Sequence, residues 1–179
     1  MAYFTKNSLQ SYENIHRLDQ DVTQNLRKAA TDTARTRVFL SHSHLDIAAA
    51  DSDDVKAARV LLASHGIDVY IDSEDPTLPR VTSALTADSL KTHIRLCDKF
   101  VLLATTNARN SKWVPWELGF ADEARGMPNV AILPVADNYG KWEGNEYMGL
   151  YQRIMISDQG HPAIFPADSG YGSHLGSFL

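Results

Sequence analysis

The sequence predicts an α/β fold with a parallel sheet of about five strands and helices on both of its faces. Short apolar runs that are typical of buried strands alternate with segments of helical period, in units of about 30 residues. The length of 179 residues fits one domain with extensions at its ends. A content of 44% apolar and 22% charged residues is ordinary for a globular protein and excludes a wholly disordered chain.

The first 35 residues predict a leader helix, or two short ones, outside the core of the fold. Apolar residues recur there at near-helical intervals, at Leu9, Ile15, Leu18, Val22 and Leu26. The domain itself is predicted to span residues 36–158. Residues 159–179 are rich in glycine, serine and proline and predict an extended tail. Its apolar residues predict that it packs on the domain or on a partner: Ile164, Phe165, Tyr171, Leu175 and Phe178.

Within the domain, strands and helices are expected in strict alternation. The predicted strands are apolar runs at residues 37–42, 67–72, 99–105 and 129–137. The predicted helices are residues 51–66, a segment marked by Leu85, Leu90 and Ile94, and residues 112–126. Gly66 is expected to end the first helix and Gly126 the third. Residues 73–80 and 106–111 are predicted loops, and residues 146–158 a short helix and a final strand.

Charge and cysteine content exclude several classes of protein. The net charge of −5 argues against a dedicated nucleic-acid surface, and no apolar run approaches the roughly 18 residues of a membrane helix. The N-terminus does not resemble a secretory signal, so a cytoplasmic location is expected. The single cysteine, Cys97, excludes an intrachain disulfide and a cysteine-built zinc site, and is expected to be a buried structural thiol. Asp51, Asp53 and Asp54 are expected at a solvated helix start rather than in a metal site.

The richest segment is SKWVPWEL, from Ser111 to Leu118. Ser111 is expected to cap a helix, because Pro115 is tolerated only near a first turn. Trp113 and Glu117 are four residues apart and share one helix face. Ligands of such folds bind outside the carboxyl ends of the strands, where this helix begins. Glu117 is therefore either a functional carboxylate or only a partner of the helix dipole, with the tryptophans in the core.

Three segments in this order resemble a bacterial Toll/interleukin-1 receptor (TIR) domain of the NAD-cleaving type: RVFLSHSHLD, VYIDSEDP and SKWVPWEL. Val114 stands where the family usually has cysteine. The similarity covers about residues 36–135 and, more weakly, residues up to about 158. The resemblance implies a flavodoxin-like sheet and NAD+ as substrate, with no cofactor and no metal. Glu117 matches the essential glutamate of the catalytic members, and Trp113 the tryptophan before it.

Cleavage of the nicotinamide–ribose bond of NAD+ can be catalysed by a single carboxylate. Nicotinamide leaves as a neutral base, and a fixed carboxylate stabilises the positive charge that develops on the ribose. The resemblance places substrate-binding residues at Ser41, His42, His44, Asp72, Glu74, Ser111 and Trp113. Asp72 is also a candidate for capping the following loop through backbone bonds, and His42 replaces a residue that is often aromatic in the family.

The resemblance also implies partners. The chain would form a homo-oligomer through the BB loop, Ser73–Arg80. Its product would be ADP-ribose or a cyclic isomer that acts as a messenger on a separate effector protein, as in bacterial anti-phage defence. Two other functions stay open. Residues 116–135 also resemble nucleoside deoxyribosyltransferases, which attack an N-glycosidic bond with a glutamate, and many TIR domains are non-catalytic adaptors.

Overall fold

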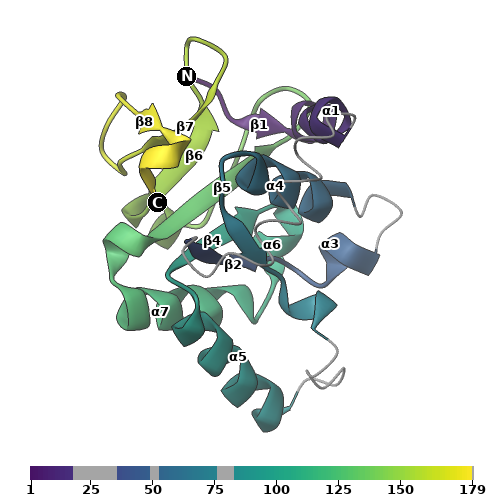
Figure 1. Ribbon diagram of the computed structural model, residues 1–179, viewed down its shortest axis with the longest axis vertical. Coiled ribbons are helices and arrows are strands. Elements are labelled where there is room, and N and C mark those ends of the chain that lie inside the picture. Colours follow the sequence, from purple (N-terminus) through teal and green to yellow (C-terminus); the bar gives the residue numbers. More distant parts are fainter. Residues whose placement is uncertain (18–35, 49–52, 76–82, 179) are drawn as a thin grey trace.

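The centre of the molecule is a sheet of five parallel strands. The computed structural model describes residues 1–17, 36–48, 53–75 and 83–178 (Figure 1). In spatial order the strands are β3 (Asp68–Tyr70), β2 (Arg37–Ser41), β4 (Lys99–Ala104), β5 (Val130–Ala136) and β6 (Gln152–Ile156). Each corresponds to a predicted strand. The expected fold class, a parallel sheet with helices on both faces, is confirmed.

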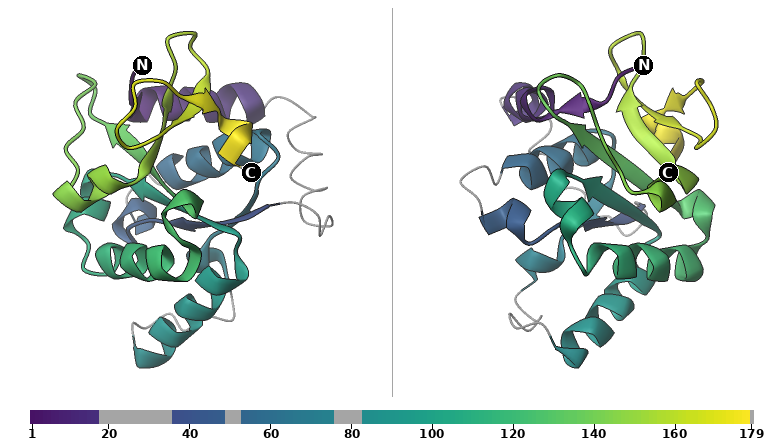
Figure 2. Two further views of the ribbon diagram at one scale, coloured as in Figure 1. Left: turned by 90° about the vertical axis from the view of Figure 1, so that its left-hand side faces the viewer. Right: turned by 180° about the vertical axis from the view of Figure 1, so that it is seen from behind.

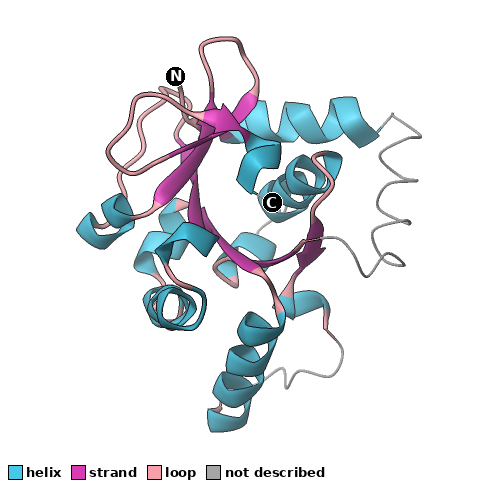
Figure 3. Cartoon of the chain, turned by 60° about the vertical axis from the view of Figure 1, so that its left-hand side comes forward, coloured by secondary structure: helices cyan, strands magenta, loops and turns pink. Residues whose placement is uncertain are grey.

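Each face of this sheet packs against two helices. Successive strand residues point to opposite faces. Leu40 and Leu103 therefore pack toward α1 (Lys6–Arg17) and α4 (Asp53–Ser64), whereas Phe39 and Leu102 pack toward α5 (Ala84–Leu96) and α7 (Val114–Arg125). Figure 3 shows the curved sheet with helices on both sides. From the neighbouring strands β2 and β4, the chain crosses over in opposite directions, to β3 and to β5. The carboxyl ends of two such strands are the usual place for a ligand site in this class of fold.

Short helices connect these elements: α3 (Leu45–Ala48), η1 (Asp72–Glu74), α6 (Thr106–Asn110), η2 (Met127–Asn129) and η3 (Glu146–Leu150). The loop prediction for residues 106–111 is therefore wrong in part. The Thr105 hydroxyl accepts a hydrogen bond from the Ala108 N–H at 3.0 Å, and Ala108 is buried. This cap and this contact stabilise a single turn that is too short to have a readable period.

The N-terminal segment belongs to the core, contrary to the predicted leader outside it. β1 (Phe4–Thr5) pairs in parallel with the end of β5, and Phe4 lies opposite Val135. Phe4 and Leu9 are fully buried in the cluster between the sheet and α4. Leu18, Val22 and Leu26 lie outside the described residues. A two-residue strand shows no periodicity, so the sequence did not indicate this pairing.

The residues after β6 continue the sheet. β7 (Pro162–Phe165) runs antiparallel to β6, β8 (Ser173–His174) runs antiparallel to β7, and η4 (Leu175–Phe178) follows. Ala2 bridges Ile156, so the N-terminus lies beside this hairpin (Figure 2). The predicted packing of the apolar tail residues is confirmed for the buried members Ile164, Phe165, Leu175 and Phe178, whereas Tyr171 is 90% exposed. The predicted boundaries of the domain, residues 36 and 158, stay a prediction.

Candidate active site

Glu117 lies in the first turn of α7, at the edge of the sheet where β2 ends. The helix begins at Val114, with Pro115 in its first turn and Trp113 at the cap position. Ser111 is expected at the cap position, but Trp113 occupies it, and the Trp113 side chain makes no capping hydrogen bond. The Ser111 hydroxyl instead accepts hydrogen bonds from the N–H groups of Trp113 and Val114, at 3.2 and 3.4 Å. Ser111 thus still satisfies the start of the helix, from two residues upstream of the cap position.

The Glu117 side chain is buried and bonded to the end of β2. It is 6% exposed, and Ser41, at 1% exposure, donates a hydrogen bond from its hydroxyl to Glu117 Oε2 at 2.6 Å. The pKa of Glu117 is raised to about 7, mainly by burial; the hydrogen bond from Ser41 lowers this pKa and the negative charge of Asp72 raises it. Glu117 is therefore a carboxylate poised near neutrality rather than a fully ionised surface group.

His42 and Asp72 form a second pair at the same sheet edge. The buried His42 follows Ser41, and its Nδ1 lies 3.8 Å from Asp72 Oδ1 and 3.3 Å from the Leu40 carbonyl oxygen. Asp72 is half-buried and opens η1 directly after β3. The site therefore combines side chains from β2, from the segment after β3 and from α7, which are distant in sequence.

Two of the predicted site residues point elsewhere. His44 is exposed, two residues beyond His42. Glu74 is also exposed, and its carboxylate forms an ion pair with Arg59 of α4 at 2.7 Å. The structure thus brings Ser41, His42, Asp72 and Glu117 together, and leaves His44 and Glu74 at the surface of the adjoining loops.

Aromatic rings extend from the site along α7. Trp113 is half-buried and meets Trp116 edge to face, with ring centroids 5.4 Å apart. Trp116 stacks on Phe120 at 6.1 Å, and Lys91 of α5 lies over both rings. The residue spacing of three and four is a helical signal that sequence reasoning did not use. This row holds α5 against α7 and fixes the orientation of the Trp113 ring.

The start of the BB loop is anchored by a triad that sequence reasoning also missed. The Tyr70 hydroxyl donates a hydrogen bond to Asp75 Oδ2 at 2.8 Å, and His93 Nε2 lies 3.3 Å from the same oxygen. The rings of Tyr70 and His93 stack with centroids 4.8 Å apart. Asp75 is the last residue described before the gap at residues 76–82, so the rest of the predicted BB loop up to Arg80 lies outside the described residues.

The thiol of Cys97 is not available as a nucleophile. Cys97 is buried, as predicted, and burial raises its pKa to about 12, so it stays protonated at neutral pH. Within the described part of the chain, histidine, cysteine and carboxylate side chains form no group of three that could hold a metal ion. A buried carboxylate at this edge of the sheet can stabilise a cation that develops on a bound sugar.

The described helices are all too short or too polar to cross a membrane. The sequence model of a family described as TIR domain matches residues 38–161. The chain is also 32% identical over 168 residues to a protein of Bacillus cereus (strain MSX-D12) named "Probable 3' cyclic ADP-D-ribose synthase ThsB'". That alignment covers 86% of this chain and 83% of the Bacillus protein.

Proposed function

Because the chain belongs to the TIR domain family, we propose that it cleaves the nicotinamide–ribose bond of NAD+, with Glu117 as the catalytic carboxylate. The observation that carries this proposal is the buried Glu117, bonded to Ser41 at the sheet edge where ligands of this fold class bind. The similarity to a protein named as a cyclic ADP-ribose synthase supports the same reaction.

In the proposed mechanism, the departure of nicotinamide leaves positive charge on the ribose. Glu117 in its ionised form stabilises this charge from a water-poor position, where electrostatic interactions are strong. Ser41 holds the carboxylate in place and favours its ionised form. The ring of Trp113 offers a flat apolar wall for nicotinamide. No strong acid is needed, because the leaving group departs as a neutral base.

We assign the remaining predicted residues to substrate binding. His42 and Asp72 form a polar pair next to Glu117, which supports a role for them in binding ribose hydroxyls. Ser111 orients Trp113 through the start of α7. His44 and Glu74 would contact substrate only if their loops close over it, since Glu74 here is paired with Arg59.

For the product, we propose a cyclic ADP-ribose isomer rather than linear ADP-ribose, because the Bacillus relative is named as a cyclic ADP-ribose synthase. Cyclisation requires that a nucleophile of the same molecule, an adenine nitrogen or a ribose hydroxyl, attacks before water does. The product would then serve as a messenger in anti-phage defence and act on a separate effector protein. We also propose that a second copy of the chain completes the site through the BB loop, Ser73–Arg80.

The experiment that tests the reaction is incubation of the full chain with NAD+ and, separately, with deoxynucleosides, followed by chromatography of the products. Release of nicotinamide together with a cyclic product is expected, and linear ADP-ribose alone would overturn the cyclase assignment. Base release from deoxynucleosides with NAD+ left intact would instead indicate the deoxyribosyltransferase reaction. A chain that binds other proteins but turns over neither NAD+ nor deoxynucleosides would be an adaptor.

Assembly is tested by measuring the rate per chain against protein concentration. If a second copy completes the site, the rate of NAD+ cleavage per chain should rise with protein concentration. This rise should follow the fraction of oligomer, which analytical ultracentrifugation measures. A constant rate per chain in a protein that stays monomeric would contradict the shared site without contradicting the reaction.

A further inference from the structure

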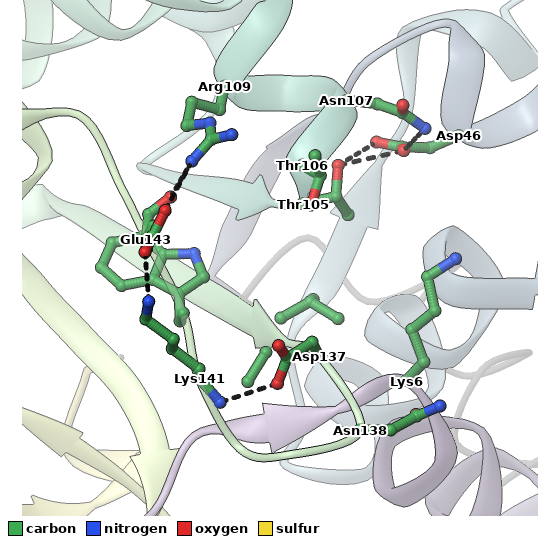
Figure 4. Close-up of a pocket in the computed structure, with 13 residues that line it drawn as sticks. Lys6, Asp46, Thr105, Thr106, Asn107, Arg109, Asp137, Asn138, Lys141 and Glu143 are labelled. Atoms are coloured by element: carbon green, nitrogen blue, oxygen red, sulfur yellow. Dashed lines mark hydrogen bonds and ion pairs between the residues drawn. The ribbon is translucent and has the colours of Figure 1, made fainter.

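A cavity of about 490 Å³ lies at the carboxyl ends of β4 and β5 (Figure 4). Its volume falls within the range of about 300–1,000 Å³ that is usual for small-molecule sites. Its walls come from α1, α3, the β4–α6 junction, and the end of β5 with the loop that follows it. Glu117 and Trp113 are not among the lining residues, so this cavity is separate from the proposed catalytic site.

Two cations in this cavity are held by a carboxylate of the same chain. Figure 4 shows Glu143 between Arg109 and Lys141. Glu143 Oε1 lies 2.6 Å from Lys141 Nζ, and Glu143 Oε2 lies 3.4 Å from Arg109 Nη1. Glu143 is exposed, and solvent-exposed ion pairs contribute little to stability. An incoming anion can therefore take the place of the Glu143 carboxylate at small cost, and two cations then face one ligand group.

The loop that carries Lys141 and Glu143 is held in place by hydrogen bonds within the chain. Asp137 Oδ1 accepts hydrogen bonds from the N–H groups of Tyr139 and Lys141, both at 2.9 Å. Trp142 Nε1 donates to the Ala104 carbonyl oxygen at the end of β4, at 2.8 Å. The cavity wall is thus preorganised, which lowers the entropic cost of binding.

The Trp142 ring is part of this built wall. It packs against Tyr3, with ring centroids 5.5 Å apart, and is only partly covered. Gly144 makes this packing possible, because a Cβ at that position would lie 2.3 Å from the ring. The ring offers an apolar surface for an aromatic base, and amide and hydroxyl groups elsewhere in the cavity lining match the polar edges of a base: Thr106, Asn107 and Asn138.

We propose that this cavity binds a nucleoside phosphate, with the phosphate between Arg109 and Lys141 in place of Glu143 and the base against Trp142. The proposal goes beyond NAD+ cleavage, because it concerns a second site. The chain segment after β2 reaches both sites. Asp46 in the cavity wall accepts hydrogen bonds from Thr105 and Asn107, and it also accepts one from the N–H of Ser43, next to His42.

The test is isothermal titration calorimetry of the full chain with AMP, adenosine and inorganic phosphate. AMP is expected to bind, and adenosine about 10-fold more weakly or worse, because it lacks the charged group. Equal binding of adenosine and AMP would overturn the role of the two cations. Equal binding of AMP and inorganic phosphate would overturn the role of Trp142.

Variants then locate the site. Arg109→Ala is expected to weaken AMP binding about 10-fold, and Glu143→Gln to strengthen it about 3-fold, because the internal competitor loses its charge. Glu146→Gln, exposed nearby and outside the cavity, is the matched control and should change nothing. Since Glu143 is exposed, its variant is expected to fold, which a thermal melt checks. AMP affinity that falls in Trp113→Ala and stays unchanged in Arg109→Ala would place AMP at the catalytic site and overturn the proposal.

Discussion

The hydroxyl of Ser41 donates a hydrogen bond of 2.6 Å to Glu117 Oε2, and both side chains are almost completely buried. This bond joins the end of β2 to the first turn of α7 and opposes the effect of burial on the carboxylate. Removing a donor to a charged acceptor favours the neutral form of that acceptor. Ser41 is therefore expected to act on the reaction mainly through the protonation state and position of Glu117.

Replacing Ser41 by alanine is expected to shift the pH dependence of NAD+ cleavage. With Ser41 present, the rate should rise with pH and reach half its maximum near the Glu117 pKa of about 7. Without the hydroxyl, the midpoint should move upward by about one pH unit, since a hydrogen bond to a charged group is worth about that much. Ser43→Ala is the matched control, because its buried hydroxyl bonds to the Leu45 N–H instead. An unchanged midpoint in Ser41→Ala would contradict this role.

The buried Glu117 also predicts a pH dependence of stability. Its pKa is raised from 4.5 to about 7, so the folded state binds the proton more tightly than the unfolded state. This tighter proton binding contributes to the free energy of unfolding; its contribution is complete below pH 4.5 and is lost as pH rises through 7. Glu117→Gln removes this dependence, so the variant should gain stability relative to the wild type by up to about 3 kcal/mol between pH 5 and pH 8.5.

Urea unfolding of both proteins at the two pH values measures this difference. Glu123→Gln, an exposed position on the same helix, should show no comparable change. An equal stability difference between Glu117→Gln and wild type at both pH values would show that burial does not disfavour the charge of Glu117.

The C-terminal residues are expected to contribute directly to the stability of the fold. Leu175 is completely buried in the same cluster as Phe4 and Leu9, so Leu175→Ala should cost about 2–5 kcal/mol in the free energy of unfolding. Tyr171→Ala, four residues away and 90% exposed, should cost less than about 0.5 kcal/mol. Chemical denaturation of the two variants checks both values. Equal effects would mean that η4 does not pack as described.

Much of the fold could be predicted because its central strands and long helices carry their own local patterns. The apolar run from Val38 to Leu40 and the helical face of Leu61 and Leu62 are buried as their spacing indicates. Local patterns failed where burial depends on distant partners. The sequence predicts that Leu85 marks a buried helix face, yet Leu85 is 74% exposed, because α5 buries only Leu90 and Ile94 and projects from the molecule at its first turn (Figure 1).

The candidate site was predictable in its residue types and less so in its contacts. Glu117 stood out through its spacing from Trp113 and through the family resemblance. The bond from Ser41 joins residues 76 positions apart, and no local pattern reports such a distance. The ion pair of Glu74 with Arg59 and the triad of Tyr70, Asp75 and His93 depend likewise on the packing of helices beside β3.

The most direct measurement of the central claim is the rate of nicotinamide release from NAD+ by Glu117→Gln beside the wild type, at equal chain concentration. Glutamine keeps the size of the side chain and can still accept the Ser41 bond, but it cannot oppose the positive charge on the ribose. The account predicts a loss of about 10²-fold or more in a variant that is folded by circular dichroism, with Glu123→Gln retaining the wild-type rate. A folded Glu117→Gln protein that releases nicotinamide as fast as the wild type would contradict the assignment of Glu117 as the catalytic carboxylate.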